Sequence, residues 1–150
     1  MKRPDFMEMA LIEAQAAAGR GEVPVGAVVA FGGEAVCREG NRTRELTDPT
    51  AHAEILAIRQ AARALGAERL TEADLYVTLE PCAMCAGAIS FARIRRLYFG
   101  AADEKGGAVV SGPRFFAQPT CHHAPEVYGG FREAEAAGLL TEFFRARRPG

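Results

Sequence analysis

Apolar residues recur along the chain at two spacings, one typical of helices and one typical of strands. After Asp5 they repeat at helical intervals as far as Ala17, which predicts a first helix with Asp5 as its N-cap and Gly19 as its end. Further helices are predicted over 50–65, 82–92 and 132–147. Apolar runs predict strands at 25–31, 34–40, 75–79, 96–100 and 126–128. Gly32 and Gly33 are expected to form the hairpin turn between the first two strands.

Helices and apolar strands alternate along most of the chain, and this order predicts the fold class. Residues 1–150 are expected to form one domain, because a chain of 150 residues can enclose a single hydrophobic core. We predict a three-layer α/β/α architecture with a central mixed sheet of about five strands flanked by helices. Residues 101–125 are rich in Gly and Pro and are predicted to form a long irregular segment, which is typical of a binding loop.

The predicted helix at 82–92 carries apolar residues on almost every side. A helix on a protein surface shows a polar face, so this helix is expected to be covered on both sides. One side would pack on the sheet, and the other would pack on a second copy of the chain in a homodimer. A central helix within a monomer is the alternative that the pattern leaves open.

The composition is that of an ordinary globular protein. Hydrophobic residues make up 49% and charged residues 25%, and the net charge of −1 gives no overall basic field for a nucleic-acid partner. The basic residues are 16 Arg and 2 Lys, a bias compatible with RNA binding and equally with biased genome composition. No apolar run approaches the roughly 18 residues of a membrane span, and the N-terminus lacks the apolar core of a signal peptide. We therefore expect a cytoplasmic protein without membrane contact.

Cys82 and Cys85 form a close pair among the four cysteines of the chain. At this spacing on a helix both thiolates can reach one ion, and we expect His52, near the start of another helix, to be its third ligand. Thiolate and imidazole ligands suit Zn²⁺. Three protein ligands leave one position of a tetrahedral zinc for water, whose pKa the metal lowers to about 7. The pattern therefore predicts one catalytic zinc per chain.

Glu54 follows His52 by two positions, about 200° around an ideal helix, so it is not expected to bind the same ion. It can reach a water on that ion only if the site lies beyond the tip of the helix. A carboxylate in that place can take a proton from water and deliver it to a base nitrogen and then to departing ammonia. We therefore predict that Glu54 is the catalytic proton shuttle.

His52-Ala-Glu54 and Pro81-Cys-Ala-Met-Cys85 together match the pattern His-x-Glu…Pro-Cys-x-x-Cys. This pattern is the known signature of zinc-dependent nucleobase deaminases, the tRNA adenosine deaminases among them. The chain closely resembles the bacterial tRNA-specific adenosine deaminases, which belong to the cytidine deaminase-like superfamily. The resemblance spans nearly the whole chain and is carried by residues 22–28, 41–42, 48–54, 75–88, 99–101 and 143–145.

The resemblance implies hydrolytic deamination of the wobble adenosine of a tRNA anticodon to inosine, by a zinc-dependent homodimer that binds the anticodon stem-loop. It implies that His52, Cys82 and Cys85 bind the zinc and that Glu54 transfers protons. It also implies contacts to the substrate from the Asn41 side chain, the Ala53 backbone at the base edge, Val25 against the base, Asp103 in a loop, and His123 and Phe144 toward the RNA.

Two other functions remain open from the sequence. The same zinc chemistry would serve a deaminase of a free base or nucleoside, such as cytosine, guanine or cytidine. A zinc-stapled RNA-binding module without catalysis would also keep the metal ligands, although it would have no use for Glu54.

Several residues also have ordinary structural interpretations. Asn41 and Asp103 could be turn residues, and the adjacent Phe143 and Phe144 are expected to face different ways, with one in the core. Relatives often have Asn-His where this chain has two histidines at 122–123. A residue of the run 121–123 could supply a fourth zinc ligand.

Overall fold

The computed structural model describes residues 4–147, so residues 1–3 and 148–150, the ends of the predicted domain, lie outside the described range. The helices are α1 (Phe6–Gly19), α2 (Ala53–Leu65), α3 (Ala83–Ala92) and α4 (Glu133–Arg147), with a short 3₁₀ helix, η1 (Phe115–Ala117). The strands are β1 (Gly26–Phe31), β2 (Glu34–Gly40), β3 (Asp74–Leu79), β4 (Arg96–Ala101) and β5 (Glu126–Tyr128). The predicted order of helices and strands is confirmed.

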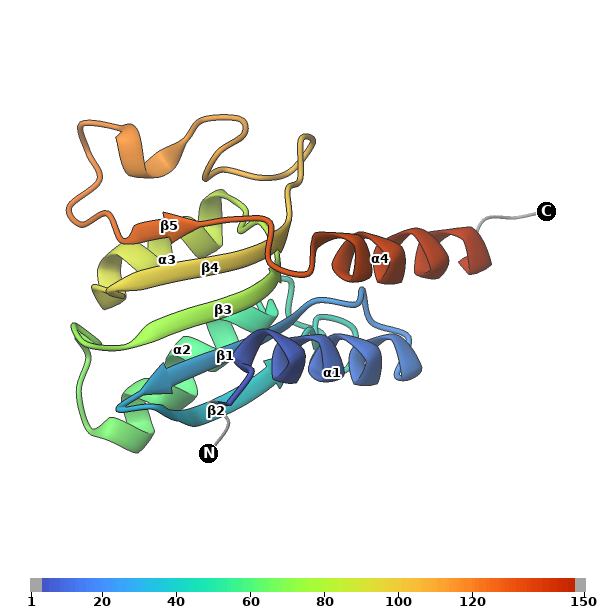
Figure 1. The fold of residues 1–150 in the computed structure, drawn as a ribbon, viewed down its shortest axis with the longest axis horizontal. Helices are drawn as coiled ribbons and strands as arrows, with labels where there is room; N and C mark the ends of the chain where they lie inside the picture. The colour runs from blue at the N-terminus through green and yellow to red at the C-terminus, as the bar shows by residue number, and fades with distance from the viewer. Residues whose placement is uncertain (1–3, 148–150) are drawn as a thin grey trace.

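The strands form one sheet in the order β2-β1-β3-β4-β5 (Figure 1). β1 pairs antiparallel with β2 and β3, whereas β3, β4 and β5 run parallel to one another. Parallel neighbours need a crossover connection, which α3 supplies between β3 and β4. The irregular segment that contains η1 makes the second crossover, between β4 and β5. The predicted mixed sheet is therefore confirmed.

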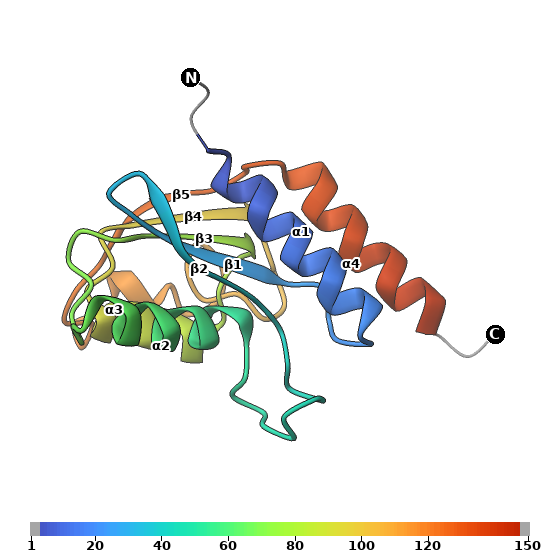
Figure 2. The same cartoon turned by 90° about the horizontal axis from the view of Figure 1, so that it is seen from below.

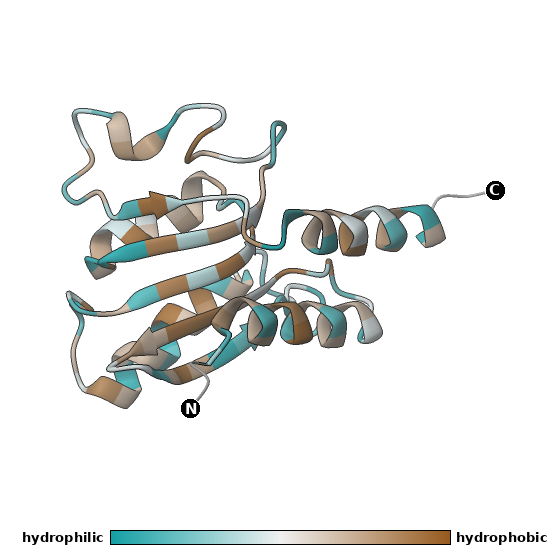
Figure 3. Ribbon diagram, viewed as in Figure 1, coloured by the Kyte–Doolittle hydropathy of each residue, from teal (hydrophilic) through white to brown (hydrophobic). Residues whose placement is uncertain are grey.

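Helices cover both faces of the sheet and complete the predicted three layers. α1 and α4 lie side by side on one face, and α2 and α3 lie on the other (Figure 2). The main core fills the space between the sheet and the second pair of helices, where Leu75, Ile89 and Leu97 are fully buried. Figure 3 shows hydrophobic residues along the strands and hydrophilic residues along much of α4. No helix within residues 4–147 is long and apolar enough to cross a membrane.

Gly26 allows α1 to pack closely against β1. A Cβ atom at this position would lie 1.9 Å from the backbone oxygen of Ala10 and 2.7 Å from the nitrogen of Ala14. Ala10 and Ala14, the two residues that approach Gly26, are both buried, so the two backbones meet there without a large side chain between them. This contact holds the start of β1, and Val25 directly before it, at one end of the sheet.

α2 begins at Ala53, later than the predicted start at residue 50. The side chain of Asp48 explains the difference, because its Oδ1 accepts hydrogen bonds from the backbone nitrogen of Thr50 at 2.9 Å and from its hydroxyl at 2.7 Å. Such a turn competes with helical backbone geometry. His52 is consequently the extended N-cap residue of α2, and Cys82 is the extended N-cap residue of α3.

The segment 102–125 is mostly irregular, as predicted, but its second half folds back onto the core. Phe115 and Phe116 of η1 are partly buried against the main core cluster. The backbone nitrogen of Phe115 also donates to Ala108 O at 2.7 Å. The first half of the segment, residues 103–111, lies at the site described below.

Candidate active site

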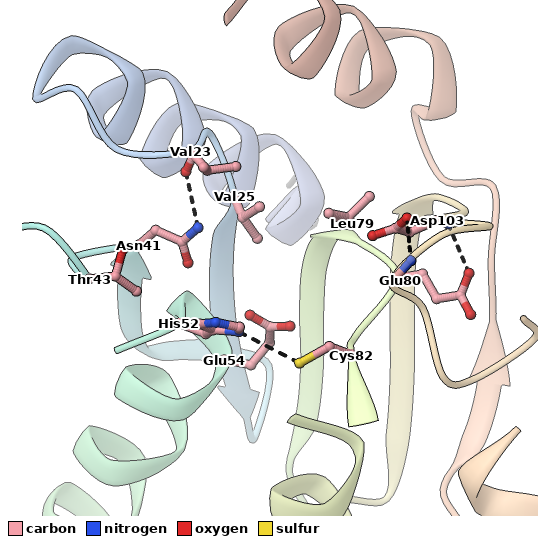
Figure 4. A pocket seen from close by; sticks show the side chains of 11 residues that line it. Val23, Val25, Asn41, Thr43, His52, Glu54, Leu79, Glu80, Cys82 and Asp103 are labelled. Atoms are coloured by element: carbon pink, nitrogen blue, oxygen red, sulfur yellow. Dashed lines mark hydrogen bonds between the residues drawn. The ribbon is translucent and has the colours of Figure 1, made fainter. Parts of the chain in front are cut away.

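A pocket of about 270 Å³ lies at the carboxyl end of β3, where α2 and α3 begin (Figure 4). In open α/β sheets this end of the parallel strands is the usual position of a ligand site. His52, Glu54 and Cys82 form the floor of the pocket, and Val25 and Asn41 lie on one side of it. Asp103 and Glu80 lie on the opposite side (Figure 4).

His52, Cys82 and Cys85 bring their ligand atoms together within 4.8 Å of one another. His52 Nδ1 is 3.7 Å from Cys82 Sγ and 3.4 Å from Cys85 Sγ. A tetrahedral zinc with ordinary bond lengths would place a nitrogen and a sulfur ligand about 3.6 Å apart. The predicted ligands therefore meet in space, and both the donor types and the spacing of the donors fit zinc.

The ligand group has strongly shifted proton affinities. A hydrogen bond from Cys85 and the nearby imidazole lower the pKa of the Cys82 thiol to about 4. The same hydrogen bond, together with burial, raises the pKa of Cys85. Hydrogen bonding to Cys82 raises the pKa of His52. Since a metal binds the deprotonated ligands, metal binding at this group would release protons.

Glu54 points into the same pocket although it is only two residues from His52 (Figure 4). The extended backbone of His52 removes the separation of about 200° that a continuous helix would impose. Only 4% of the Glu54 surface is exposed, and this burial raises the pKa of its carboxyl group to about 6. A carboxyl group with such a pKa can both accept and donate a proton near neutral pH.

Asn41 uses its side chain to tie two walls of the pocket together. Its Nδ2 donates to Val23 O at 3.1 Å, and its Oδ1 accepts from the backbone nitrogen of Ala53 at 2.8 Å. Asn41 lines the pocket, as does Val25, which is 6% exposed. The Ala53 N–H is therefore directed at Asn41. Asp103 also lines the pocket, and its Oδ1 closes a local turn by accepting from the backbone of Lys105 and Gly106.

Comparison with known proteins agrees with this arrangement. The MafB19-like deaminase family matches residues 1–148 of the chain. The tRNA-specific adenosine deaminase of Agrobacterium fabrum is 66% identical over 147 residues, which cover 98% of this chain and 97% of the relative. The enzyme of the same name from Aquifex aeolicus is 44% identical over 148 residues, with coverage of 99% and 97%. This chain belongs to the tRNA-specific adenosine deaminase family.

Solved structures support both the family and the fold. One from studies of A-to-I editing by tRNA:A34 deaminases is 68% identical, has a TM-score of 0.89, and covers 90% of this chain and 98% of its own. A guanine deaminase from Bacillus subtilis is 27% identical, with a TM-score of 0.67 and coverage of 100% and 99%. The three-layer structure is thus the cytidine deaminase-like fold that the resemblance implied.

His123 lies near the C-terminal end of α3, whereas Cys82 lies at the N-terminal end of this helix. The Nε2 of His123 donates to Ile94 O at 2.7 Å, and its backbone nitrogen donates to Ser90 Oγ at 3.1 Å. The structure therefore does not bring His123 to the pocket of its own chain, and its contact with RNA stays a prediction. Within residues 4–147 the candidate metal group does not include any residue of 121–123, so no fourth protein ligand is indicated.

Phe143 and Phe144 face different ways on α4, as expected. Phe143 is 7% exposed and carries the Arg147 guanidinium 3.7 Å above its ring, whereas Phe144 is 48% exposed. Phe144 does not line the pocket, so its proposed role in holding RNA also stays a prediction.

Glu80 and Leu79 both line the pocket, and the sequence predicted no role for either. Both lie within the segment that carries the resemblance. For Glu80 the available signal was a charged residue directly after the apolar strand and directly before Pro81. Such a residue is rarely buried without partners.

Proposed function

We propose that this family member hydrolytically deaminates the wobble adenosine of a tRNA anticodon to inosine, with a zinc ion held by His52, Cys82 and Cys85. The observation that carries the proposal is the meeting of these metal donors with the buried carboxyl group of Glu54 in one pocket. The 66% identity with a tRNA-specific adenosine deaminase supports the tRNA substrate.

Glu54 is the proton carrier of the proposed reaction. Zinc, when bound, supplies a Lewis acid that makes water nucleophilic near neutral pH. Glu54 accepts the proton of the attacking water and delivers it to the ring nitrogen beside the amino-bearing carbon. Glu54 then takes the remaining proton of the water-derived hydroxyl and delivers it to the exocyclic nitrogen. The bond from carbon to this nitrogen breaks, ammonia leaves, and the oxygen of water stays on the base as a carbonyl.

Residues around the pocket position the nucleoside. Val25 and Leu79 supply apolar surface for the base, as both line the pocket. Asn41 retains one amide hydrogen after its bond to Val23 and offers it to the ribose or base. The Ala53 N–H is shared between Asn41 and the base edge, and Asp103 contacts the substrate from the opposite side. His123 and Phe144 would contact RNA outside this pocket.

A second copy of the chain is the proposed partner of α3. Met84 and Phe91 are 37% and 73% exposed, so the outer side of this apolar helix is not covered within the chain. This exposure favours the homodimer over a central helix within a monomer. The replacement Phe91→Asp should shift the molecular mass measured by light scattering from dimer to monomer.

Two further expectations accompany the proposal. Residues 1–150 would form one domain, which is supported by a single sheet that joins β1 to β5. A cytoplasmic location is supported by the proposed tRNA substrate and by the absence of a disulfide bond among Cys37, Cys82, Cys85 and Cys121.

The decisive experiment is inosine formation in an anticodon stem-loop that carries a wobble adenosine. Free adenosine, cytosine, cytidine and guanine serve as competing substrates, and the Glu54→Ala enzyme is the blank. We expect inosine in the stem-loop, loss of turnover after chelation, and recovery with added zinc. Turnover of guanine with an unmodified stem-loop would instead favour the free-base function, which the similarity to a guanine deaminase keeps as second candidate.

A further inference from the structure

The carboxylate of Glu80 is enclosed by hydrogen-bond donors from one segment of the chain. Its Oε2 accepts from the backbone nitrogens of Val109 at 3.0 Å and of Val110 and Ser111 at 2.9 Å. Its Oε1 accepts from the backbone nitrogen of Asp103 at 2.9 Å and from the Ser111 hydroxyl at 3.0 Å. Only 2% of the residue is exposed. Both carboxylate oxygens are therefore occupied by residues 103–111.

The segment is shaped around this carboxylate. A Cβ atom at Gly107 would lie 2.5 Å from the carboxyl carbon of Glu80 and 2.5 Å from Asp103 O. The Gly107 nitrogen donates to Asp103 O at 2.8 Å, and the next nitrogen, that of Ala108, donates to Pro81 O at 2.9 Å. Glycine is thus required where the loop passes the carboxylate, and the bond to Pro81 joins the loop to the start of the Pro-Cys-x-x-Cys motif.

This arrangement places one wall of the active-site pocket. Asp103 and Gly106 line the pocket, and both lie within the segment that Glu80 holds. Hydrogen bonds to an ionised acceptor are about twice as strong as neutral ones, so several together favour a single loop conformation. If the loop were ordered in only a fraction of the free molecules, the apparent dissociation constant for substrate would equal the intrinsic constant divided by that fraction. A disordered loop would therefore weaken substrate binding.

We propose that Glu80 is a positioning residue that presets the 103–111 wall for the RNA substrate, and so determines substrate affinity without touching the reacting atoms. The inference rests on the proposed tRNA deaminase function. It assigns to Glu80 a task separate from that of Glu54, because the carboxylate of Glu80 is committed to its own loop rather than to the floor of the pocket.

The variant Glu80→Gln tests this inference with little change in volume. The NH₂ group of the glutamine amide would face hydrogen-bond donors of the loop in either orientation of the amide, because donors surround both carboxylate oxygens of Glu80. We expect KM for the wobble-adenosine stem-loop to rise about 10- to 100-fold, the effect of losing bonds to a charged acceptor. We expect kcat at saturating stem-loop and bound zinc per chain to stay within about twofold of wild type.

Exchange of backbone amides provides an independent readout. Hydrogen exchange followed by mass spectrometry should be faster in peptides covering 103–111 of the Glu80→Gln enzyme, and unchanged in peptides of β1 and β3. Glu72→Gln, which makes the same charge change at an exposed residue, should leave both KM and exchange unaltered. Ser111→Ala removes one donor of the set and should raise KM by about three- to tenfold. This milder variant keeps the test usable if Glu80→Gln fails to fold.

The outcomes distinguish a failure of the proposed tRNA deaminase function from a failure of the role assigned to Glu80. If the wild-type enzyme forms no inosine in the stem-loop, the proposed function fails. If the wild type is active but Glu80→Gln keeps its KM, Glu80 does not preset the wall and this inference is overturned. If Glu80→Gln does not fold, an unchanged KM in Ser111→Ala overturns it instead. Loss of zinc with a collapse of kcat would also overturn it, because Glu80 would then act through Cys82. A raised KM with retained kcat and faster loop exchange supports it.

Discussion

Glu54 and Glu80 line the same pocket and are both buried. Their surroundings nevertheless shift the pKa values of their carboxyl groups in opposite directions. Burial raises the pKa of Glu54 to about 6. Burial acts in the same sense at Glu80, but hydrogen bonds from the backbone nitrogens of 103–111 outweigh it and lower the pKa. One carboxyl group can therefore exchange a proton near neutral pH, while the other stays charged and holds a loop.

Glu22 repeats the Glu80 arrangement with a different loop, residues 43–45. It is 1% exposed and accepts from the backbone nitrogens of Arg44 at 3.1 Å and Glu45 at 2.8 Å. The Thr43 hydroxyl is a third donor at 3.4 Å, and Thr43 lines the pocket. Buried carboxylates thus hold loops that contribute Thr43 and Asp103 to the pocket. All three glutamates are buried, so the number of hydrogen-bond donors, rather than burial, explains the different directions of their pKa shifts.

The largest expected effect comes from removing the proton carrier. Glu54→Gln keeps the size and burial of the side chain but cannot accept a proton, so kcat should fall by at least about 10²- to 10⁴-fold. Zinc content by atomic emission and the melting temperature should match wild type, since Glu54 is not a metal donor. Turnover retained in this variant would refute the assignment of Glu54.

Replacing Glu80 should act on stability as well as on substrate affinity. Glu80→Gln leaves loop N–H groups opposite an amide, and the free energy of unfolding should fall by about 2–4 kcal/mol. Urea denaturation measures this change, with Glu72→Gln as the control that should stay within about 0.5 kcal/mol of wild type. Equal stability of the two variants would mean that the charge of Glu80 is not needed by its donors.

The pH dependence of the free energy of unfolding can test whether Glu22, like Glu80, stabilises the fold as a charged carboxylate. Burial raises the pKa of Glu22, but the bonds from Glu45, Arg44 and Thr43 outweigh it, so the pKa is lower in the folded than in the unfolded protein. This carboxylate therefore stabilises the fold above the unfolded pKa of about 4.3, and the contribution is lost as the pH falls through the folded pKa.

The variant Glu22→Gln should remove this acid-sensitive contribution. Compared with wild type, it should be less stable near neutral pH and should lose less stability on acidification from about pH 5 to pH 3. Urea midpoints measured across this range for both proteins decide the matter. Parallel curves for the two proteins would show that Glu22 has the same pKa folded and unfolded.

The smallest effect is expected at Thr43. Thr43→Val removes the long hydroxyl contact to Glu22 but leaves both backbone donors, so the free energy of unfolding should fall by no more than about 1 kcal/mol. Differential scanning calorimetry can detect a change of this size. A loss as large as that of Glu22→Gln would show that the hydroxyl, rather than the backbone, holds the carboxylate.

Much of the fold could be predicted because its signals are local. Apolar periodicity located each α-helix and strand seen in residues 4–147, although it missed the short 3₁₀ helix η1, and the spacing of Cys82 and Cys85 indicated a shared ion. The start of α2 was misplaced, since the turn made by Asp48 and Thr50 interrupts a pattern that otherwise continues as a helix. That displacement matters for function, because the extended His52 is what lets Glu54 reach the same pocket.

Long-range features could not be predicted from the sequence. Nothing near position 123 in the chain shows that His123 bonds to Ile94 at the far end of α3. For Phe143 and Phe144 the sequence predicted that one would be buried, and only the structure identifies it as Phe143.

From the sequence alone, the order of elements could be predicted by local periodicity, and the metal donors and the proton carrier by two short motifs, one containing His52 and Glu54 and the other Cys82 and Cys85. Only the tertiary structure decided how Glu80 is used. Its donors lie 23 to 31 residues further along the chain. They reach it because parallel pairing of β3 with β4 brings the segment after β4 back over the end of β3. Hydrogen bonds across such a distance depend on the packed sheet rather than on any local pattern of residues.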